Sequence, residues 1–82
     1  MDYEAKLTEL RATIAVTADM RARSELYALY RNCRIVYDEM SKEEVECRRR
    51  KKVTQKYKDL EAELQERIAN FEQWITFSKL LY

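Results

Sequence analysis

The feature that most constrains this chain is the complete absence of glycine and proline from its 82 residues. Glycine supplies positive φ angles and proline sets tight turns, so sheets and loop-rich folds are difficult to build without them. Charged residues make up 38% of the chain, which is typical of long helices and coiled coils. Hydrophobic residues make up 46%, which is too many for a disordered segment. The sequence therefore predicts a single all-α domain.

The first half of the chain carries apolar residues at the three- and four-residue spacing of an amphipathic helix. One apolar series ends at Ile14, and a second series begins at Ala22 in a shifted register. Such a shift marks a stutter or a bend, and Thr17 or Asp19 could cap a restarted helix. The two series are Tyr3, Leu7, Leu10 and Ile14, then Ala22, Leu26, Leu29, Cys33, Val36 and Met40.

The second half carries the more regular pattern, with charged residues on the opposite face. Its apolar series is Val53, Tyr57, Leu60, Leu64, Ile68, Phe71, Trp74, Ile75 and Leu81. The preceding segment Ser41-Lys42-Glu43-Glu44 fits the S-x-x-E capping box that opens many helices. This pattern predicts one helical arm over residues 2–40 and a second arm over residues 42–82, in one interaction module.

Three arrangements satisfy these patterns. The first is an antiparallel two-helix hairpin or coiled coil that turns near Ser41 and forms an oligomer or a bundle with a partner. The second is one long helix in a coiled-coil dimer, because the apolar seam stays in phase across the charged centre. The third is a short first helix followed by two longer ones, separated near residues 17–21. We favour the hairpin, in which Cys33 and Cys47 would come close enough for mild oxidation to form an intramolecular disulfide. In the cell we expect both to be buried free thiols of a reducing compartment.

Several classes of function lack the residues that they need. The chain has no histidine for acid–base chemistry at neutral pH and no glycine-rich loop for phosphates. Its two cysteines are too few and too far apart for a zinc site. We therefore expect no catalysis, metal, cofactor or small-molecule ligand.

The location of the protein can also be predicted from its composition. No run approaches the length of a membrane span, and the N-terminus lacks the apolar region of a signal peptide. We therefore expect no membrane association and an intracellular, cytoplasmic location. A nuclear location is the alternative, because five consecutive basic residues begin at Arg48.

Two segments carry more apolar surface than one facing helix can cover. Residues 26–37 are apolar over more than one stripe, and residues 71–82 extend beyond the seam. Aromatic residues are the usual anchors of protein interfaces. The predicted partner-binding residues are Leu26, Tyr27, Tyr30, Tyr37, Trp74, Phe77, Leu80, Leu81 and Tyr82. These faces predict a non-enzymatic protein–protein interaction subunit, a structural or adaptor component that binds itself or another protein.

The centre of the chain carries a sharp change of charge, from acidic residues at 38–46 to basic residues at 48–58. The basic patch consists of Arg48, Arg49, Arg50, Lys51, Lys52, Lys56 and Lys58. Such a patch can bind the phosphates of RNA or DNA, and Tyr57 could add stacking. The alternative function is therefore a nucleic-acid-binding helical hairpin. The competing interpretation is that the five consecutive charges encircle a helix and pair with the preceding glutamates.

Overall fold

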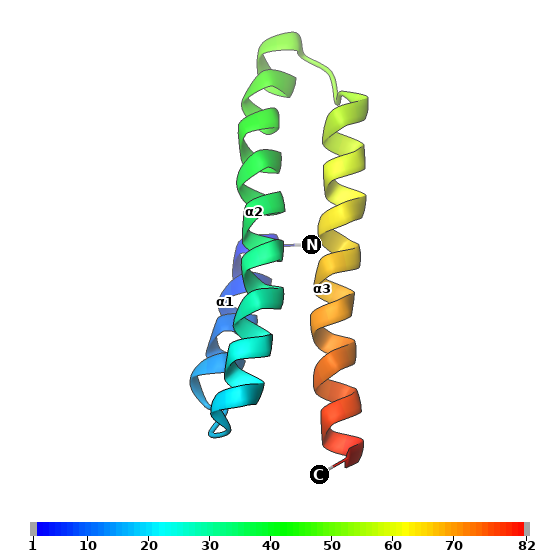
Figure 1. The fold of residues 1–82 in the computed structure, drawn as a ribbon. Helices are drawn as coiled ribbons and strands as arrows, with labels where there is room; N and C mark the ends of the chain where they lie inside the picture. The colour runs from blue at the N-terminus through cyan, green and yellow to red at the C-terminus, as the bar shows by residue number, and fades with distance from the viewer. Residues whose placement is uncertain (1, 82) are drawn as a thin grey trace.

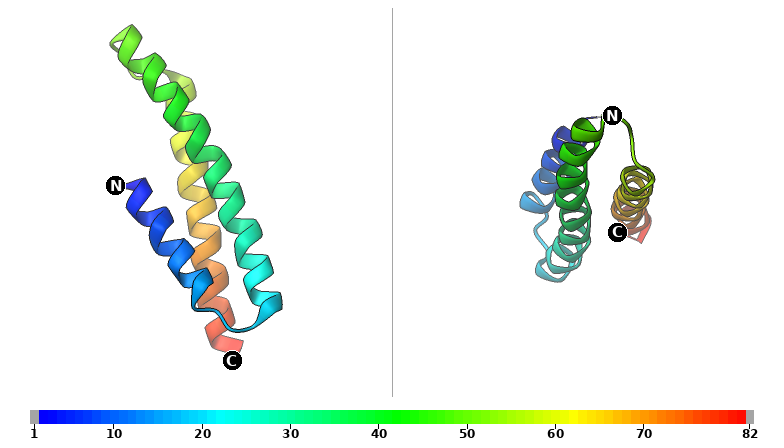
Figure 2. Two further views of the ribbon diagram at one scale, coloured as in Figure 1. Left: turned by 90° about the vertical axis from the view of Figure 1, so that its left-hand side faces the viewer. Right: turned by 90° about the horizontal axis from the view of Figure 1, so that it is seen from above.

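A computed structural model describes the backbone of residues 2–81 and the side chains of residues 2–77. This part of the chain consists of three α-helices, namely α1 (Tyr3–Ala15), α2 (Met20–Arg50) and α3 (Gln55–Leu81), and contains no strand. The prediction of an all-α fold is confirmed. Helices α2 and α3 pack side by side and antiparallel, whereas α1 lies along only the lower half of α2 (Figure 1). Figure 2 shows that the upper part of α2 and α3 extends well beyond α1.

The break between α1 and α2 falls at residues 16–19, beside the register shift in the sequence. A carboxylate oxygen of Asp2 accepts a hydrogen bond from the Ala5 N–H at 3.1 Å and thereby caps α1. Asp19 caps α2 in the same manner, with its carboxylate 3.3 Å from the Arg21 nitrogen. The prediction that Thr17 or Asp19 restarts the helix is confirmed at Asp19. The chain thus follows the arrangement of one short helix and two longer ones.

The predicted turn near Ser41 is wrong, and the capping box does not start a helix. Helix α2 runs without interruption from Met20 to Arg50, across the expected boundary between the two arms. Its apolar series continues through Met40, which is buried, so packing against α3 keeps the helix intact past Ser41. The chain reverses only at residues 51–54, and this reversal also excludes the single long helix.

Helix α2 ends at Lys51, which adopts the left-handed conformation with φ 57° and ψ 35°. The N–H groups of Lys51 and Lys52 donate to the carbonyls of Arg48 and Cys47 at 3.3 Å and 3.1 Å. This pattern is the Schellman motif, in which glycine usually occupies the left-handed position. A lysine in that position explains why the sequence carries no visible signal for the turn.

We expect Lys51→Gly to stabilise the fold. Removal of the Cβ relieves the steric cost of the left-handed conformation, and the greater freedom of glycine in the unfolded chain offsets part of that gain. The free energy of unfolding should rise by about 0.5–1 kcal/mol and the melting temperature by a few degrees. Thermal melts followed by circular dichroism measure the change. Lys52→Gly is the control, because that residue has a negative φ and should gain nothing. Equal melting temperatures for both variants would contradict the prediction.

The position of the turn also separates the two cysteines. Cys33 and Cys47 both lie in α2, fourteen positions apart, which corresponds to about 21 Å along a helix. A disulfide requires Cα atoms within about 7 Å, so the predicted intramolecular bridge is wrong for this fold. Cys33 is a buried core residue, and burial raises the pKa of its thiol.

The core combines one apolar stripe from each helix. The buried residues are Tyr3, Leu7, Leu10, Ile14, Leu26, Tyr30, Cys33, Val36, Met40, Leu60, Leu64, Ile68 and Phe71. Polar contacts also connect α1 to α3 at the edge of this core. The Tyr3 hydroxyl accepts a hydrogen bond from the Gln65 amide at 2.8 Å, and Lys6 lies 2.9 Å from the Glu72 carboxylate. Helix α1 therefore begins beside Gln65 and leaves the hairpin beyond that level uncovered.

Candidate interaction surfaces

Thr54 links α2 and α3 by hydrogen bonds at the point where the chain reverses. Its hydroxyl donates to the Glu43 carboxylate of α2 at 2.8 Å and accepts from the Tyr57 N–H at 3.2 Å. The Thr54 N–H donates to the Cys47 sulfur at 3.5 Å. Glu43 is further paired with Lys56 at 3.9 Å. A single threonine side chain therefore caps α3 and ties it to α2.

We expect Thr54→Ala to lower the free energy of unfolding by about 1–2 kcal/mol, because both the cap and the bond to Glu43 are lost. The melting temperature should fall by roughly 5–15 °C. Thr54→Ser is the matched control, since it keeps the hydroxyl and should stay close to the wild type. Circular dichroism melts test both variants. If the alanine and serine variants melt together, the hydroxyl contributes nothing to stability.

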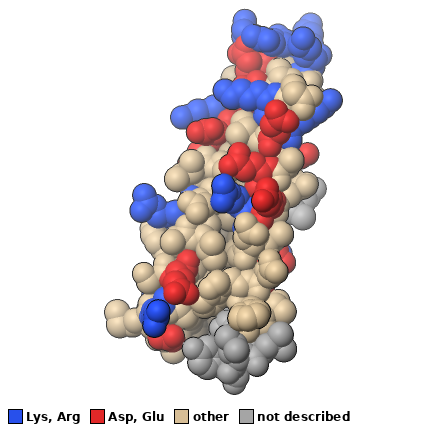
Figure 3. Space-filling model, turned by 45° about the vertical axis from the view of Figure 1, so that its right-hand side comes forward, with Lys and Arg blue, Asp and Glu red and all other residues tan. Residues whose placement is uncertain are grey.

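The basic patch surrounds the connection between α2 and α3, where Lys and Arg side chains cover the upper end of the molecule (Figure 3). Arg48 pairs with Glu44 at 2.7 Å. Arg49 and Arg50 both hydrogen-bond to Glu46, and these bonds lower the pKa of that carboxyl to about 2. The expected glutamate partners of the arginines are therefore confirmed. Because such exposed pairs are screened by solvent, each contributes little to stability.

Three of the four lysines of the patch differ from its arginines, whereas Lys56 is paired with Glu43. Lys51, Lys52 and Lys58 form no ion pair with the described part of the chain. The five consecutive charges do not encircle one helix, because α2 ends at Lys51. Arg48, Lys51 and Lys52 instead line a hollow of about 380 Å³, together with Cys47, Val53 and Tyr57.

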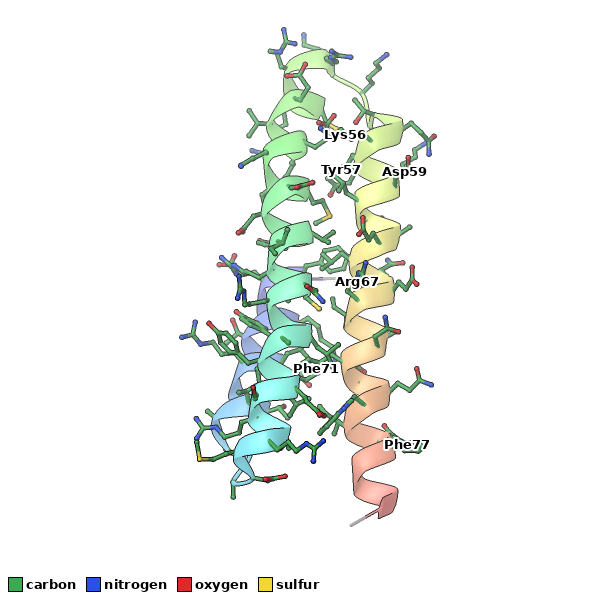
Figure 4. The ribbon with its side chains drawn as sticks, viewed as in Figure 1. Lys56, Tyr57, Asp59, Arg67, Phe71 and Phe77 are labelled. Atoms are coloured by element: carbon green, nitrogen blue, oxygen red, sulfur yellow. The ribbon has the colours of Figure 1, made fainter. Side chains whose placement is uncertain are left out.

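This hollow combines basic and apolar side chains, and the acidic Glu44 also lines it. Val53 is 57% exposed, whereas Tyr57 is half-buried, and burial is the main reason that its pKa is raised. Figure 4 shows Tyr57 directed from α3 toward α2. The hollow lies on the stripe of α2 that carries Glu44 and Arg48, and Tyr37 continues that stripe one heptad before Glu44. The Arg34 guanidinium lies over the Tyr37 ring, 5.3 Å from its centroid.

The predicted partner-binding residues do not form one surface. Leu26 and Tyr30 are buried in the core, so the structure contradicts their assignment to an interface. They were assigned incorrectly because α1 provides a second neighbour for α2 within the same chain. Tyr37 and Trp74 are half-buried and pack against the core. Trp74 also lines a groove of about 600 Å³ near the end of α1.

Two predicted partner-binding residues are exposed, and they come from different helices. Tyr27 is 54% exposed and lines a shallow hollow with Ile14 and Met20 at the α1–α2 connection. Phe77 is 63% exposed and points away from α2 (Figure 4). The predicted contacts of Leu80, Leu81 and Tyr82 lie outside the residues whose side chains are described.

The chain matches no family model, and no curated protein or solved structure is significantly similar to it. Within residues 2–81, none of the helices is both long and apolar enough to cross a bilayer. No group of three or more His, Cys, Asp or Glu side chains in the described residues is arranged to hold a metal ion. The function is therefore inferred from the exposed surfaces described above.

The turn at residues 51–54 separates basic from acidic residues along the hairpin, and the sequence pattern did not predict this separation. We define the hairpin tip as residues 42–58, which contain eight Lys/Arg and three Glu. The segments 34–41 and 59–66 lie together below the tip, because Glu43 faces Thr54 and Lys56 across the antiparallel helices. These two segments form an acidic belt with one basic residue, Arg34, and the acids Asp38, Glu39, Asp59, Glu61, Glu63 and Glu66. A turn at Ser41 would have placed acidic and basic segments side by side.

Proposed function

We propose that this chain is a non-catalytic, helical interaction subunit that binds another protein through the outward face of α3 around Phe77. The observation that carries the proposal is the 63% exposure of Phe77, which lies six positions after the buried Phe71 on α3. The core already contains Phe71, and Trp74 and Ile75 pack against it. Phe77 lies outside this packing and is exposed. Burial of a phenylalanine in an interface contributes roughly 1.5–3 kcal/mol, and aromatic residues often dominate binding.

The test places a photo-crosslinking phenylalanine analogue at position 77 of the full chain in cells, with the same analogue at Ala62 as control. Both residues are exposed on α3, and they lie fifteen positions apart, which corresponds to about 22 Å along the helix. We expect one defined adduct from position 77 and no such adduct from position 62. Phe77→Glu should abolish copurification of the crosslinked protein while helicity is retained, whereas Ala62→Glu should leave copurification intact. Absence of an adduct from position 77 would overturn the proposal.

The proposal includes a cytoplasmic location. Cys33 and Cys47 are both free thiols, which is the usual state of cysteine in the reducing interior of a cell. Fractionation of cells that express the tagged full chain tests the location. Recovery in an oxidising compartment would contradict it.

The second candidate function is nucleic-acid binding at the hairpin tip, with a nuclear location as its companion. The observation that favours it is the hollow in which Lys51 and Lys52 adjoin Tyr57. Cationic side chains neutralise phosphates and an aromatic ring can stack on a base. Lys51→Glu with Lys52→Glu should then abolish retention on an RNA or DNA oligonucleotide, and retention by the wild type should fall steeply with salt. Retention that is unchanged by the double substitution would exclude this function.

A further inference from the structure

We propose that two copies of this chain pair antiparallel through the uncovered part of the α2–α3 hairpin, with the tip of each copy on the acidic belt of the other. This inference rests on the proposed function, because it names a second copy as one partner of the interaction subunit. The surface that would pair the two copies is distinct from the face of α3 around Phe77. Three features support this pairing, namely the accessible Tyr37 with the neighbouring hollow, the opposite charges along the hairpin, and the start of α1, which limits the overlap.

The open stripe begins where α1 ends its cover of the hairpin. On α2, Tyr30, Tyr37 and Glu44 follow one another at heptad spacing and share one stripe. Tyr30 is buried, whereas Tyr37 and Glu44 are only half-buried. Tyr37 therefore lies on the stripe that is buried in the three-helix part and becomes accessible beyond α1. The hollow above it adds the exposed Val53 and the half-buried Tyr57.

The charges along this hairpin are self-complementary. The hairpin tip has an excess of five positive charges, from eight Lys/Arg and three Glu. The acidic belt has an excess of five negative charges over its whole circumference, from six Asp/Glu and one Arg. Glu39 and Glu63 lie on the opposite side of the hairpin, so Asp38 and Glu61 are the acids that the partner's tip would meet. A two-fold axis near Glu43 and Glu44 would place each tip on the belt of the other copy. A parallel pairing would instead bring like charges together, which opposes association.

The start of α1 limits how far the second copy can slide. The hydrogen bond between Tyr3 and Gln65 fixes the first turn of α1 at the lower edge of the belt. The partner tip can therefore cover about 16 residues of α2, roughly 24 Å, before it meets α1. Asp2 and Glu4 are exposed at that position and add negative charge opposite the partner's lysines. The overlap converts the open two-helix part into a four-helix section.

This interface is narrow, because the bundle is only 19 Å by 18 Å in cross-section. Its area falls below that of a standard stable interface, so charge attraction supplies much of the association. Sedimentation equilibrium should show the wild-type mass rising from 10.0 kDa toward twice that value with concentration at low salt. About 0.5 M salt should shift the protein back to monomer.

The decisive test is an exchange of charges between two variants. The tip variant is Lys51→Glu with Lys52→Glu, and the belt variant is Asp38→Lys with Glu61→Lys. Each variant alone sets like charges against each other where positions 51 and 52 of one copy meet positions 38 and 61 of the other, and it lowers the excess charge of the tip or the belt from five to one. Each variant alone should therefore dimerise far more weakly than the wild type. An equimolar mixture of the two variants should form a heterodimer, because one contact keeps the wild-type charges and the other sets positions 51 and 52 against charges of opposite sign at positions 38 and 61. Circular dichroism of each variant checks that the helices are retained. Recovery of the dimer in the mixture would show independently that both variants are folded.

A control with the same change of net charge uses the opposite side of the hairpin. Glu39 lines a polar hollow with Glu43 and Lys56, and Glu63 points to that side of α3. Glu39→Lys with Glu63→Lys should therefore dimerise more strongly than the belt variant. Equal loss in both variants, a monomeric wild type at all concentrations, or a mixture that stays monomeric would overturn the proposal. A monomer that binds RNA through Lys51 and Lys52 would also overturn it.

The outcome is separable from the test of the proposed function. Phe77→Glu should leave the dimer intact, because Phe77 lies at the other end of α3 from the tip. The tip variant should retain the crosslink from position 77. Loss of dimerisation with an intact crosslink refutes only the dimer, and the reverse result refutes only the α3 interface.

Discussion

Replacement of Phe71 by alanine should lower the free energy of unfolding by about 3–5 kcal/mol. Phe71 is fully buried on α3, and Figure 4 shows it directed from α3 toward the interior of the bundle. The substitution removes the largest fully buried side chain and leaves a cavity among helices that cannot fully collapse. Because a domain of this kind is stabilised by only about 5–15 kcal/mol, the variant should be partly unfolded at physiological temperature.

Urea and thermal unfolding followed by circular dichroism measure this loss. Phe77→Ala provides the control, since it removes the same side chain from the same helix at a site that is 63% exposed. That variant should change the free energy of unfolding by less than about 0.5 kcal/mol. Similar losses for the two variants would show that the packing described for α3 is incorrect.

Leu7→Ala should have the second largest effect, about 2–5 kcal/mol, and should act first on α1. Leu7 is 1% exposed and lies at the centre of the short stripe that holds α1 on the hairpin. A helix of 13 residues is marginal by itself in water, so α1 should unfold locally when this contact is lost. Hydrogen exchange measures the effect directly.

The amides of residues 7–15 should exchange faster in Leu7→Ala, and those of residues 26–40 should be affected less. Thr8→Ala is the control, because Thr8 is exposed on the same turn and alanine is a good helix former. Its exchange should match that of the wild type. Equal acceleration in all three helices would mean that α1 and the hairpin unfold as one unit.

The helical stripes were predictable because their periodicity is local in the sequence. Leu7, Leu64 and Phe71 were placed in apolar series, and all three are buried. The helix restart at Asp19 was also predictable from a register shift and a capping side chain. The arginine–glutamate pairs follow from i,i+4 spacing on a helix, which Arg48 and Glu44 illustrate.

The candidate surfaces were only partly predictable. Phe77 was identified from its position off the seam, and it is exposed. Leu26 and Tyr30 were assigned to an interface because a broad apolar face looks the same in the sequence whether its second neighbour is α1 or another protein. The basic patch was visible as a run of charges, but its arrangement around a hollow required the end of α2 at Lys51.

The helical class of this protein and the residues of its apolar stripes follow from local sequence patterns alone. The lack of glycine and proline and the three- and four-residue spacing act within single turns of helix, so no tertiary contact is needed to recognise them. The end of α2, by contrast, depends on contacts between helices. The Ser41 pattern was the stronger local signal, but burial of Met40 against α3 continues the helix past it. The reversal instead uses a left-handed lysine at Lys51 and the bond from Thr54 to Glu43, which joins residues eleven positions apart.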